Sequence, residues 1–329
     1  MPRIIRLYAF GGPENLKLDD LPSQQPGPGQ VRLRVEASSV TRDHFTFMSG
    51  RQFRGHGFVQ PSLPTRLGYE SAGVIDQVGE GVDATWVGKR VSTVVGFDES
   101  RYGTLGEEAI VPVANVYEYP SNLTGAEAAA FWVPYLTAYG GLVHIARVER
   151  GDFVSISAGS SSVGLAAVQF ARDSGATAIA VIRRAAKKDE VLSLGAQHVI
   201  VTDEEDYESR VRDITEGKGV RICFDPIGGP FVEQLAAASA PGGMIVEYGV
   251  LSGQPATLPV MPLIGKGLSI RGYTVSEITR DPAIGATAKE FIYNRLADGR
   301  FRPKVDKIFP LDRTADAYRY VSSSQQIAG

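Results

Sequence analysis

One run of small residues has the spacing of a phosphate-binding loop, and it reads Gly159, Ser160, Ser161, Ser162, Val163 and Gly164. A strand-like segment at 153–157 precedes it, and a helix-forming segment at 162–175 follows. Small side chains let the backbone approach a phosphate, and the free N–H groups of a helix's first turn donate to the anion. The loop has serine at the middle position of the G-x-G-x-x-G pattern. It predicts a pyrophosphate site, although such a turn also occurs in ordinary packing.

Three basic residues follow the next expected strand, and they are Arg183, Arg184 and Lys187. An NAD(H) site usually has a carboxylate at this place, on the ribose hydroxyl groups. Here no carboxylate appears before Asp189. Guanidinium groups attract a 2′-phosphate, which a carboxylate would repel. The pattern favours NADP(H) over NAD(H). The alternative is a solvated basic start of a helix, where the cations oppose the helix dipole.

The elements that must position these residues alternate regularly after about residue 150. The expected strands are 153–157, 178–182, 199–201, 221–224, 244–248 and 268–271. The expected helices between them are 162–175, 187–194, 207–215 and 231–238, and others are expected at 134–145, 283–297 and 314–321. This order is typical of an α/β fold with a doubly wound parallel sheet. Before about residue 125, short strands broken by glycine and proline predict a separate β-rich domain.

Length and composition exclude several classes of protein. A chain of 329 residues exceeds most single cores, so two domains are expected. The net charge of −3 speaks against a nucleic-acid partner, and no apolar run reaches the roughly 18 residues of a membrane span. The single cysteine, Cys223, excludes an intrachain disulfide and a zinc site with two thiolates. Without a signal peptide, we expect a cytoplasmic protein.

Three further motifs spread over the chain: Gly68-Tyr69-Glu70-Ser71-Ala72-Gly73-Val74-Ile75, Pro134-Tyr135-Leu136-Thr137-Ala138-Tyr139 and Phe224-Asp225-Pro226-Ile227-Gly228-Gly229. With the loop at 159–164, they resemble the medium-chain dehydrogenase/reductase superfamily, in its zinc-independent, quinone oxidoreductase-like branch. The resemblance implies a GroES-like catalytic domain at 1–124 and a Rossmann cofactor-binding domain at 125–265. It implies that 266–329 returns to complete the catalytic domain, that nicotinamide binds in the cleft between the domains, and that two copies form a homodimer through the cofactor domain.

The resemblance adds two positions to the expected cofactor site. Relatives often carry a tyrosine after the third strand of the Rossmann sheet, and Thr202 stands there in this chain. Gly249 ends the stretch that begins with Gly242 and Gly243. Thr202 is expected at the adenosine end, near the 2′-phosphate of NADP(H), and Gly249 among the residues that line the cofactor.

The chain departs from the zinc-dependent relatives at the metal ligands. Tyr69 stands where they have a histidine, and the first cysteine ligand falls near Val40 or Thr41. Zinc is held by imidazole and thiolate groups, and neither occurs at these places. We therefore expect no metal. The alternative is an unorthodox site formed by His44, His56, Asp43 and Glu70.

The resemblance implies hydride transfer from NADPH to a quinone or an α,β-unsaturated carbonyl compound. Three residues are candidates for catalysis: Tyr69 as a hydrogen-bond donor, Asp43 at an acidic position common in the family, and Thr137 near the nicotinamide. Each also has a structural explanation, namely a packing tyrosine, a structural acid and a threonine inside a helix. The tyrosine that serves as acid in some enoyl reductases is missing, which leaves solvent as an alternative proton source.

Two rival functions share this fold and cofactor. One is an enoyl thioester reductase, which would act on enoyl thioesters and little on quinones. The other is a non-catalytic NADP(H)-binding protein, since no acid or base is unambiguous in the sequence.

Overall fold

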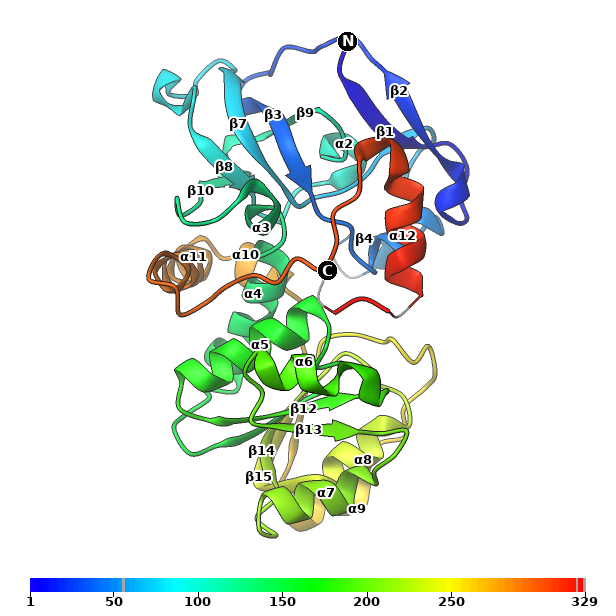
Figure 1. Cartoon of the computed structure of the whole chain (residues 1–329), viewed down its shortest axis with the longest axis vertical. Coiled ribbons are helices and arrows are strands. Elements are labelled where there is room, and N and C mark those ends of the chain that lie inside the picture. The colour runs from blue at the N-terminus through cyan, green and yellow to red at the C-terminus, as the bar shows by residue number, and fades with distance from the viewer. Residues whose placement is uncertain (55–56, 324, 328–329) are drawn as a thin grey trace. The chain divides into compact units, whose positions relative to one another are not determined.

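The computed structural model describes residues 1–54, 57–323 and 325–327. They form two compact units (Figure 1). We call Met1–Val133 with Arg302–Ile327 the β unit, and Pro134–Phe301 the Rossmann unit. These borders differ from the expected ones at 124/125 and 265/266. Strand β16 (Ser269–Gly272) and helix α11 (Pro282–Ala297) belong to the Rossmann unit, so only the chain after Phe301 groups with the β unit.

The Rossmann unit contains a six-stranded parallel sheet in the order β13-β12-β11-β14-β15-β16. Its other strands are β11 (Phe153–Ile156), β12 (Thr177–Ile182), β13 (His198–Val201), β14 (Val220–Asp225) and β15 (Ser239–Glu247). The chain starts in the centre, at β11, winds to one edge and then returns to build the other half from β14. The carboxyl ends of β11 and β14 are therefore the topological switch point, where such sheets bind ligands.

Helices cover both faces of this sheet. In Figure 1, α5 (Ser162–Asp173) and α6 (Lys188–Ser193) lie on one face, and α7 (Tyr207–Ile214), α8 (Phe231–Ala238) and α9 (Val260–Lys266) on the other. Because both faces are covered, the strands are apolar along their whole length, and Val154, Ile179 and Ile222 have no exposed surface. The expected doubly wound parallel sheet is confirmed.

One expected helix differs in the structure. The segment at 134–145 consists of α4 (Trp132–Ala138), which crosses the border between the units, and a following π-helix, η4 (Tyr139–Ile145). Gly140 and Gly141 stand at the start of η4 and have low α-helical propensity. In the described part of the chain, no helix is both long and apolar enough to cross a membrane.

The β unit is built from antiparallel strands. A five-stranded sheet has the order β10-β8-β7-β3-β9, with β10 (Val116–Glu118), β8 (Arg90–Thr93), β7 (Ser71–Val78), β3 (Gln30–Ser38) and β9 (Glu108–Pro112). The smaller sheets are formed by β2 (Leu16–Asp20), β1 (Arg3–Leu7) and β6 (Thr65–Arg66), and by β4 (Gln52–Arg54) with β5 (Gly57–Val59). The short helices are α1 (His44–Met48), α2 (Glu99–Tyr102) and α3 (Gly125–Ala128), and α10 (Ser276–Thr279) is a short helix of the Rossmann unit.

The end of the chain completes the core of the β unit. Helix α12 (Thr314–Ser322) carries Tyr318, which is fully buried. Tyr318 packs in one apolar cluster with Leu7, Phe47 and Leu105. The β unit therefore needs the last part of the chain to close its core.

Candidate functional site

The predicted phosphate loop joins the end of β11 to the start of α5. The side chain of Ser161 caps the helix, because its Oγ accepts a hydrogen bond from the N–H of Gly164 at 3.1 Å. Ser162 and Val163 occupy the first turn, where backbone N–H groups have no carbonyl of the same helix to bind. These N–H groups and the helix dipole suit a pyrophosphate. Ser160 to Val163 are all half-buried, so an anion can reach the loop.

Close packing holds the loop in this shape. A Cβ atom on Gly164 would lie 2.5 Å from the carbonyl oxygen of Ala158, so no larger residue fits without moving the loop. Ala158 itself has a φ of 48°, which non-glycine residues rarely adopt. The N–H of Gly159 donates to the carbonyl of Val181 in β12 at 2.9 Å. The loop is thus tied to the strand that leads to the basic residues.

The basic residues stand at the end of β12. Arg183 and Arg184 are exposed, and neither guanidinium forms an ion pair within the described residues. Lys187 is half-buried in the short helix η5 (Ala185–Lys187). Thr202 follows β13 and is exposed, and its N–H donates to the carbonyl of Ile182 at 2.9 Å. The backbone of Thr202 therefore lies beside the end of β12, where the two arginines begin.

An acidic run also reaches this place, and the sequence interpretation missed it. The N–H of Asp203 donates to the carbonyl of Arg183 at 3.2 Å, and both Asp203 and Glu204 are exposed. Strand pairing brings this run next to the arginines, although the two are separated along the chain. The acids lower the positive potential that a 2′-phosphate would meet.

Gly249 follows β15 on the other side of the switch point. A Cβ atom on it would lie 2.8 Å from the carbonyl oxygen of Pro226, in the loop after β14. All of the predicted cofactor-binding residues thus follow the carboxyl ends of β11, β12, β13 and β15, and the parallel sheet brings these ends to one edge. The residues present fit a dinucleotide.

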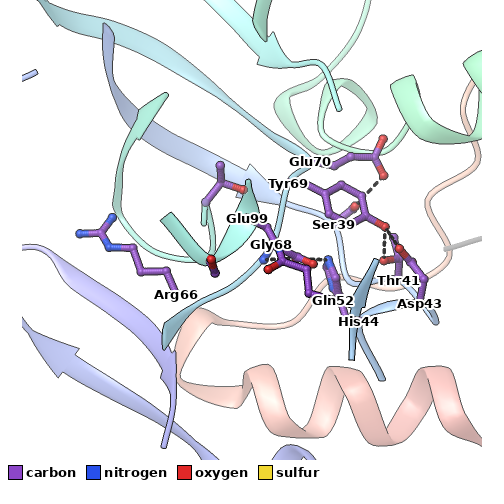
Figure 2. Close-up of polar contacts among 12 residues, drawn as sticks. Ser39, Thr41, Asp43, His44, Gln52, Arg66, Gly68, Tyr69, Glu70 and Glu99 are labelled. Atoms are coloured by element: carbon purple, nitrogen blue, oxygen red, sulfur yellow. Dashed lines mark hydrogen bonds and ion pairs between the residues drawn. The ribbon is translucent and has the colours of Figure 1, made fainter. Parts of the chain in front are cut away.

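The catalytic candidates Tyr69 and Asp43 meet within the β unit. Figure 2 shows the ring of Tyr69 pointing toward Thr41 and Asp43. The hydroxyl of Tyr69 donates to the carboxylate of Asp43, and its oxygen lies 3.0 Å from Oγ1 of Thr41. Tyr69 has one hydroxyl hydrogen, so Thr41 is the donor in the second bond. Tyr69 is buried, whereas Asp43 is exposed. The phenol is thus linked to solvent through a carboxylate.

Burial sets the protonation of this cluster. Burial, and then the charge of Asp43, raise the pKa of Tyr69 well above its ordinary value, so the phenol is a neutral donor. Burial raises the pKa of Glu70 to about 8, although the N–H of Val133 and the hydroxyl of Ser39 donate to its two oxygens at 2.8 and 3.1 Å. Near neutral pH, Glu70 therefore holds a proton, and the phenol of Tyr69 stays protonated.

A second buried group, His44, lies against Tyr69, and the sequence interpretation considered it only as a ligand of the alternative metal site. The ring of His44 packs edge-on against Tyr69, with 4.8 Å between centroids, and its Nδ1 lies 2.8 Å from the hydroxyl of Tyr318. Its Nε2 lies 3.8 Å from Oε2 of Glu99. Burial lowers the pKa of His44 and raises that of Glu99 to about 8. These contacts join α1, α2 and α12, which no sequence motif connects.

The donor set in the β unit does not fit a zinc ion. Val40 is aliphatic, and the hydroxyl of Tyr69 is engaged by Asp43 and Thr41. Both oxygens of Glu70 accept hydrogen bonds. Within the residues that the structure describes, no three histidine, cysteine or acidic side chains are grouped so as to hold a metal. The alternative site included His56, which lies outside the described residues.

Thr137 belongs to the other unit. It lies in α4, two residues before η4, and is 6% exposed.

A pocket of about 280 Å³ lies within the β unit, between the end of β3 and the returning segment. Val40, Leu105, Phe309 and Val321 form part of its apolar wall. Tyr69 and Asp43 do not line it.

Two known families match the two parts of the chain. Residues 27–134 match the family described as "Alcohol dehydrogenase GroES-like domain", and residues 162–288 match the family described as "Zinc-binding dehydrogenase". The first match lies almost wholly in the β unit and the second in the Rossmann unit.

Similar curated proteins cover nearly the whole chain. A synaptic vesicle membrane protein VAT-1 homolog of Rattus norvegicus is 30% identical, over 99% of this chain and 82% of its own length. A 2-haloacrylate reductase of a Burkholderia species is 30% identical, over 98% and 96% of the two chains. The human quinone oxidoreductase is 29% identical, over 97% and 93%.

Solved structures show the same fold. The quinone oxidoreductase of Pseudomonas syringae superposes with a TM-score of 0.86 at 27% identity, over 99% of this chain and 98% of that one. The Escherichia coli quinone oxidoreductase, solved in complex with NADPH, superposes with a TM-score of 0.85 at 25% identity, over the same shares.

Proposed function

Because the chain belongs to the medium-chain dehydrogenase/reductase superfamily, in its quinone oxidoreductase-like branch, we propose that it is an NADPH-dependent, zinc-independent oxidoreductase. Its substrate is a quinone or another conjugated carbonyl compound. One observation carries the choice of cofactor: the capped start of α5 and the unpaired guanidinium groups of Arg183 and Arg184 lie at one edge of the sheet. The first suits the pyrophosphate, and the second suits the 2′-phosphate.

NADPH, when bound, supplies the hydride, and the protein supplies position and electrostatics. Reduction of a conjugated carbonyl leaves negative charge on an oxygen atom, which needs a hydrogen-bond donor and then a proton. Tyr69 is the proposed donor, because its phenol is neutral and held in place by Asp43 and Thr41. To serve, its O–H must turn from Asp43 toward the substrate. We assign the proton to solvent, and we place Thr137 beside the nicotinamide.

The experiment that tests this function is a screen of NADPH oxidation. Quinones, enones, enals, 2-haloacrylates and enoyl thioesters are offered at equal concentration, each with NADPH and with NADH. We expect turnover with NADPH on quinones or simple conjugated carbonyl compounds. Turnover on enoyl thioesters alone would replace the proposal by an enoyl thioester reductase.

A non-catalytic NADP(H)-binding protein is the second candidate, and one contact favours it. Both hydrogen-bonding functions of the Tyr69 hydroxyl are used within the protein, by Asp43 and Thr41. If that arrangement persists with ligands bound, no donor is left for a substrate. Tight binding of NADPH without turnover on any acceptor in the screen would establish this alternative.

We also propose that the protein forms a homodimer through the Rossmann unit. Strand β16 ends the sheet order, so one of its edges is open to another strand. Nearby α9 exposes Met261 and Ile264 by 79% and 76%, and Leu258 precedes it. Light scattering coupled to gel filtration should give twice the mass of 35.3 kDa. Replacing Met261 and Ile264 by aspartate should give a monomer, because charges would be buried at the interface.

A further inference from the structure

Two carboxyl groups lie at the edge of the Rossmann sheet that we propose binds the dinucleotide. Asp225 ends β14 and Glu247 ends β15, and the two are partners in the parallel register. Asp225 is fully buried, and its Oδ2 accepts a hydrogen bond from the N–H of Gly228 at 2.7 Å. Oδ1 of Asp225 and Oε1 of Glu247 are buried without a hydrogen-bond partner of ordinary geometry in the described part of the chain.

Among the described residues, no cation is paired with these two acids. Neither of them forms an ion pair within the described residues. The other titratable groups that face the pair are the thiol of Cys223 and the phenols of Tyr207 and Tyr248. Burial raises the pKa of Cys223 to about 12 and raises those of both phenols, so all three are neutral. Ionising both of two adjacent carboxyl groups in such surroundings is therefore costly, which favours a state with one proton on the pair.

The pair is placed to act on the cofactor site through its neighbours. Asp225 holds the N–H of Gly228, which opens a loop where Gly228 and Gly229 both have left-handed backbone. Glu247 precedes Gly249 by two residues, and Ser157, whose buried side chain faces Asp225, opens the phosphate loop. A change of charge at the pair therefore reaches the loops after β11, β14 and β15.

We infer that Asp225 and Glu247 share one proton, and that this proton keeps the edge of the sheet able to receive an anionic dinucleotide. Both are positioning residues. The inference rests on the proposed function, because the dinucleotide is the cofactor of that function. With the proton in place, the pair carries one negative charge. Without it, two adjacent charges repel each other and the pyrophosphate.

The sign of the pH dependence follows from this arrangement. Burial, and then the charge of Asp225, raise the pKa of Glu247 to about 8, and burial raises that of Asp225. An anionic ligand binds the protonated pair better, so binding takes up a proton above this pH. Affinity should fall as the pH rises through about 8, by at most about tenfold per pH unit for one coupled proton.

The test measures the Kd of NADPH and of NADH at intervals from about pH 6.5 to about pH 9.5. It compares the wild type, Glu247→Gln and the control Glu233→Gln, which changes an exposed acid on α8. We expect the wild type and the control to lose affinity above about pH 8 for both ligands, and Glu247→Gln to keep a constant Kd. A constant Kd in the wild type, or the same loss in Glu247→Gln, would overturn the inference.

A second measurement does not depend on the folding of a variant. Calorimetric titration of the wild type with NADH near pH 8.5, in buffers of different ionisation enthalpy, counts the protons taken up on binding. Uptake of a substantial fraction of one proton is expected, and no uptake overturns the inference. If neither dinucleotide binds even at about pH 7, the proposed function fails, and the inference fails with it. If a dinucleotide binds at about pH 7 but takes up no proton near pH 8.5, only the inference fails.

Discussion

The buried hydroxyl of Tyr69 donates a hydrogen bond to the exposed carboxylate of Asp43, 26 residues earlier in the chain. The bond fixes the direction of the phenol and connects it to solvent. It also means that the Tyr69 hydrogen is not free in this arrangement. A catalytic role for Tyr69 therefore depends on whether its O–H can leave Asp43, and this can be measured.

Replacing Tyr69 by phenylalanine should lower kcat by about tenfold or more and leave the Kd of NADPH unchanged, because one hydrogen bond to a developing charge is lost. Steady-state kinetics and a binding titration check this. The matched control is Thr41→Val, which removes the donor to Tyr69 and keeps the phenol. An unchanged kcat in Tyr69→Phe would make Tyr69 a packing residue.

Replacing Arg183 and Lys187 together by alanine should raise the Kd of NADPH by about tenfold or more and the Kd of NADH by much less. The reason is that an exposed guanidinium without an ion pair binds a phosphate that only NADPH carries. Fluorescence titration with both cofactors gives the ratio of the two Kd values. Arg212→Ala, on the exposed side of α7, is the control for a general loss of positive charge. Equal losses of affinity for NADPH and NADH would show that these residues do not bind the 2′-phosphate.

Replacing Ser161 by alanine should lower the free energy of unfolding by about 1 kcal/mol, because the N–H of Gly164 loses its capping acceptor. The same change should weaken the binding of NADPH and of NADH equally, since both cofactors contain the pyrophosphate. Chemical denaturation and cofactor titration measure the two effects. Ser160→Ala, one position before the cap, should leave the stability nearly unchanged, and a similar loss there would contradict the capping role of Ser161.

Glu70 should make the protein less stable as the pH rises. Its pKa in the folded state is raised to about 8 by burial, so the folded state holds a proton that the unfolded state has released. Stability from this group is fully present below about pH 4.5 and is lost progressively up to about pH 8. Urea denaturation at a series of pH values should show a smaller decline in Glu70→Gln. Glu80→Gln, at an exposed site, should behave as the wild type. An identical decline in all three proteins would show that Glu70 is ionised in the folded state.

Local sequence was sufficient for the features that depend on neighbouring residues. The alternation of strands and helices predicted the parallel sheet, because hydrophobic period follows directly from the sequence. The run from Gly159 to Gly164 predicted a loop that leads into a helix at 162–175, and α5 does begin at Ser162, because this signal lies within a few neighbouring residues. The family resemblance, carried by motifs such as the one around Tyr69, is confirmed by the matches along the whole chain.

Tertiary structure alone decided which side chains meet. The bond between Tyr69 and Asp43, the packing of His44 against Tyr318, and the pairing of Asp225 with Glu247 join segments far apart in the chain. Each depends on strand register or on the docking of α12, and hydrophobic period cannot specify these. The acidic run that begins at Asp203, after β13, lies next to Arg183 for the same reason. Sequence therefore determined the kinds of chemistry available to this protein, and the packing of distant segments determined which groups share protons and charge.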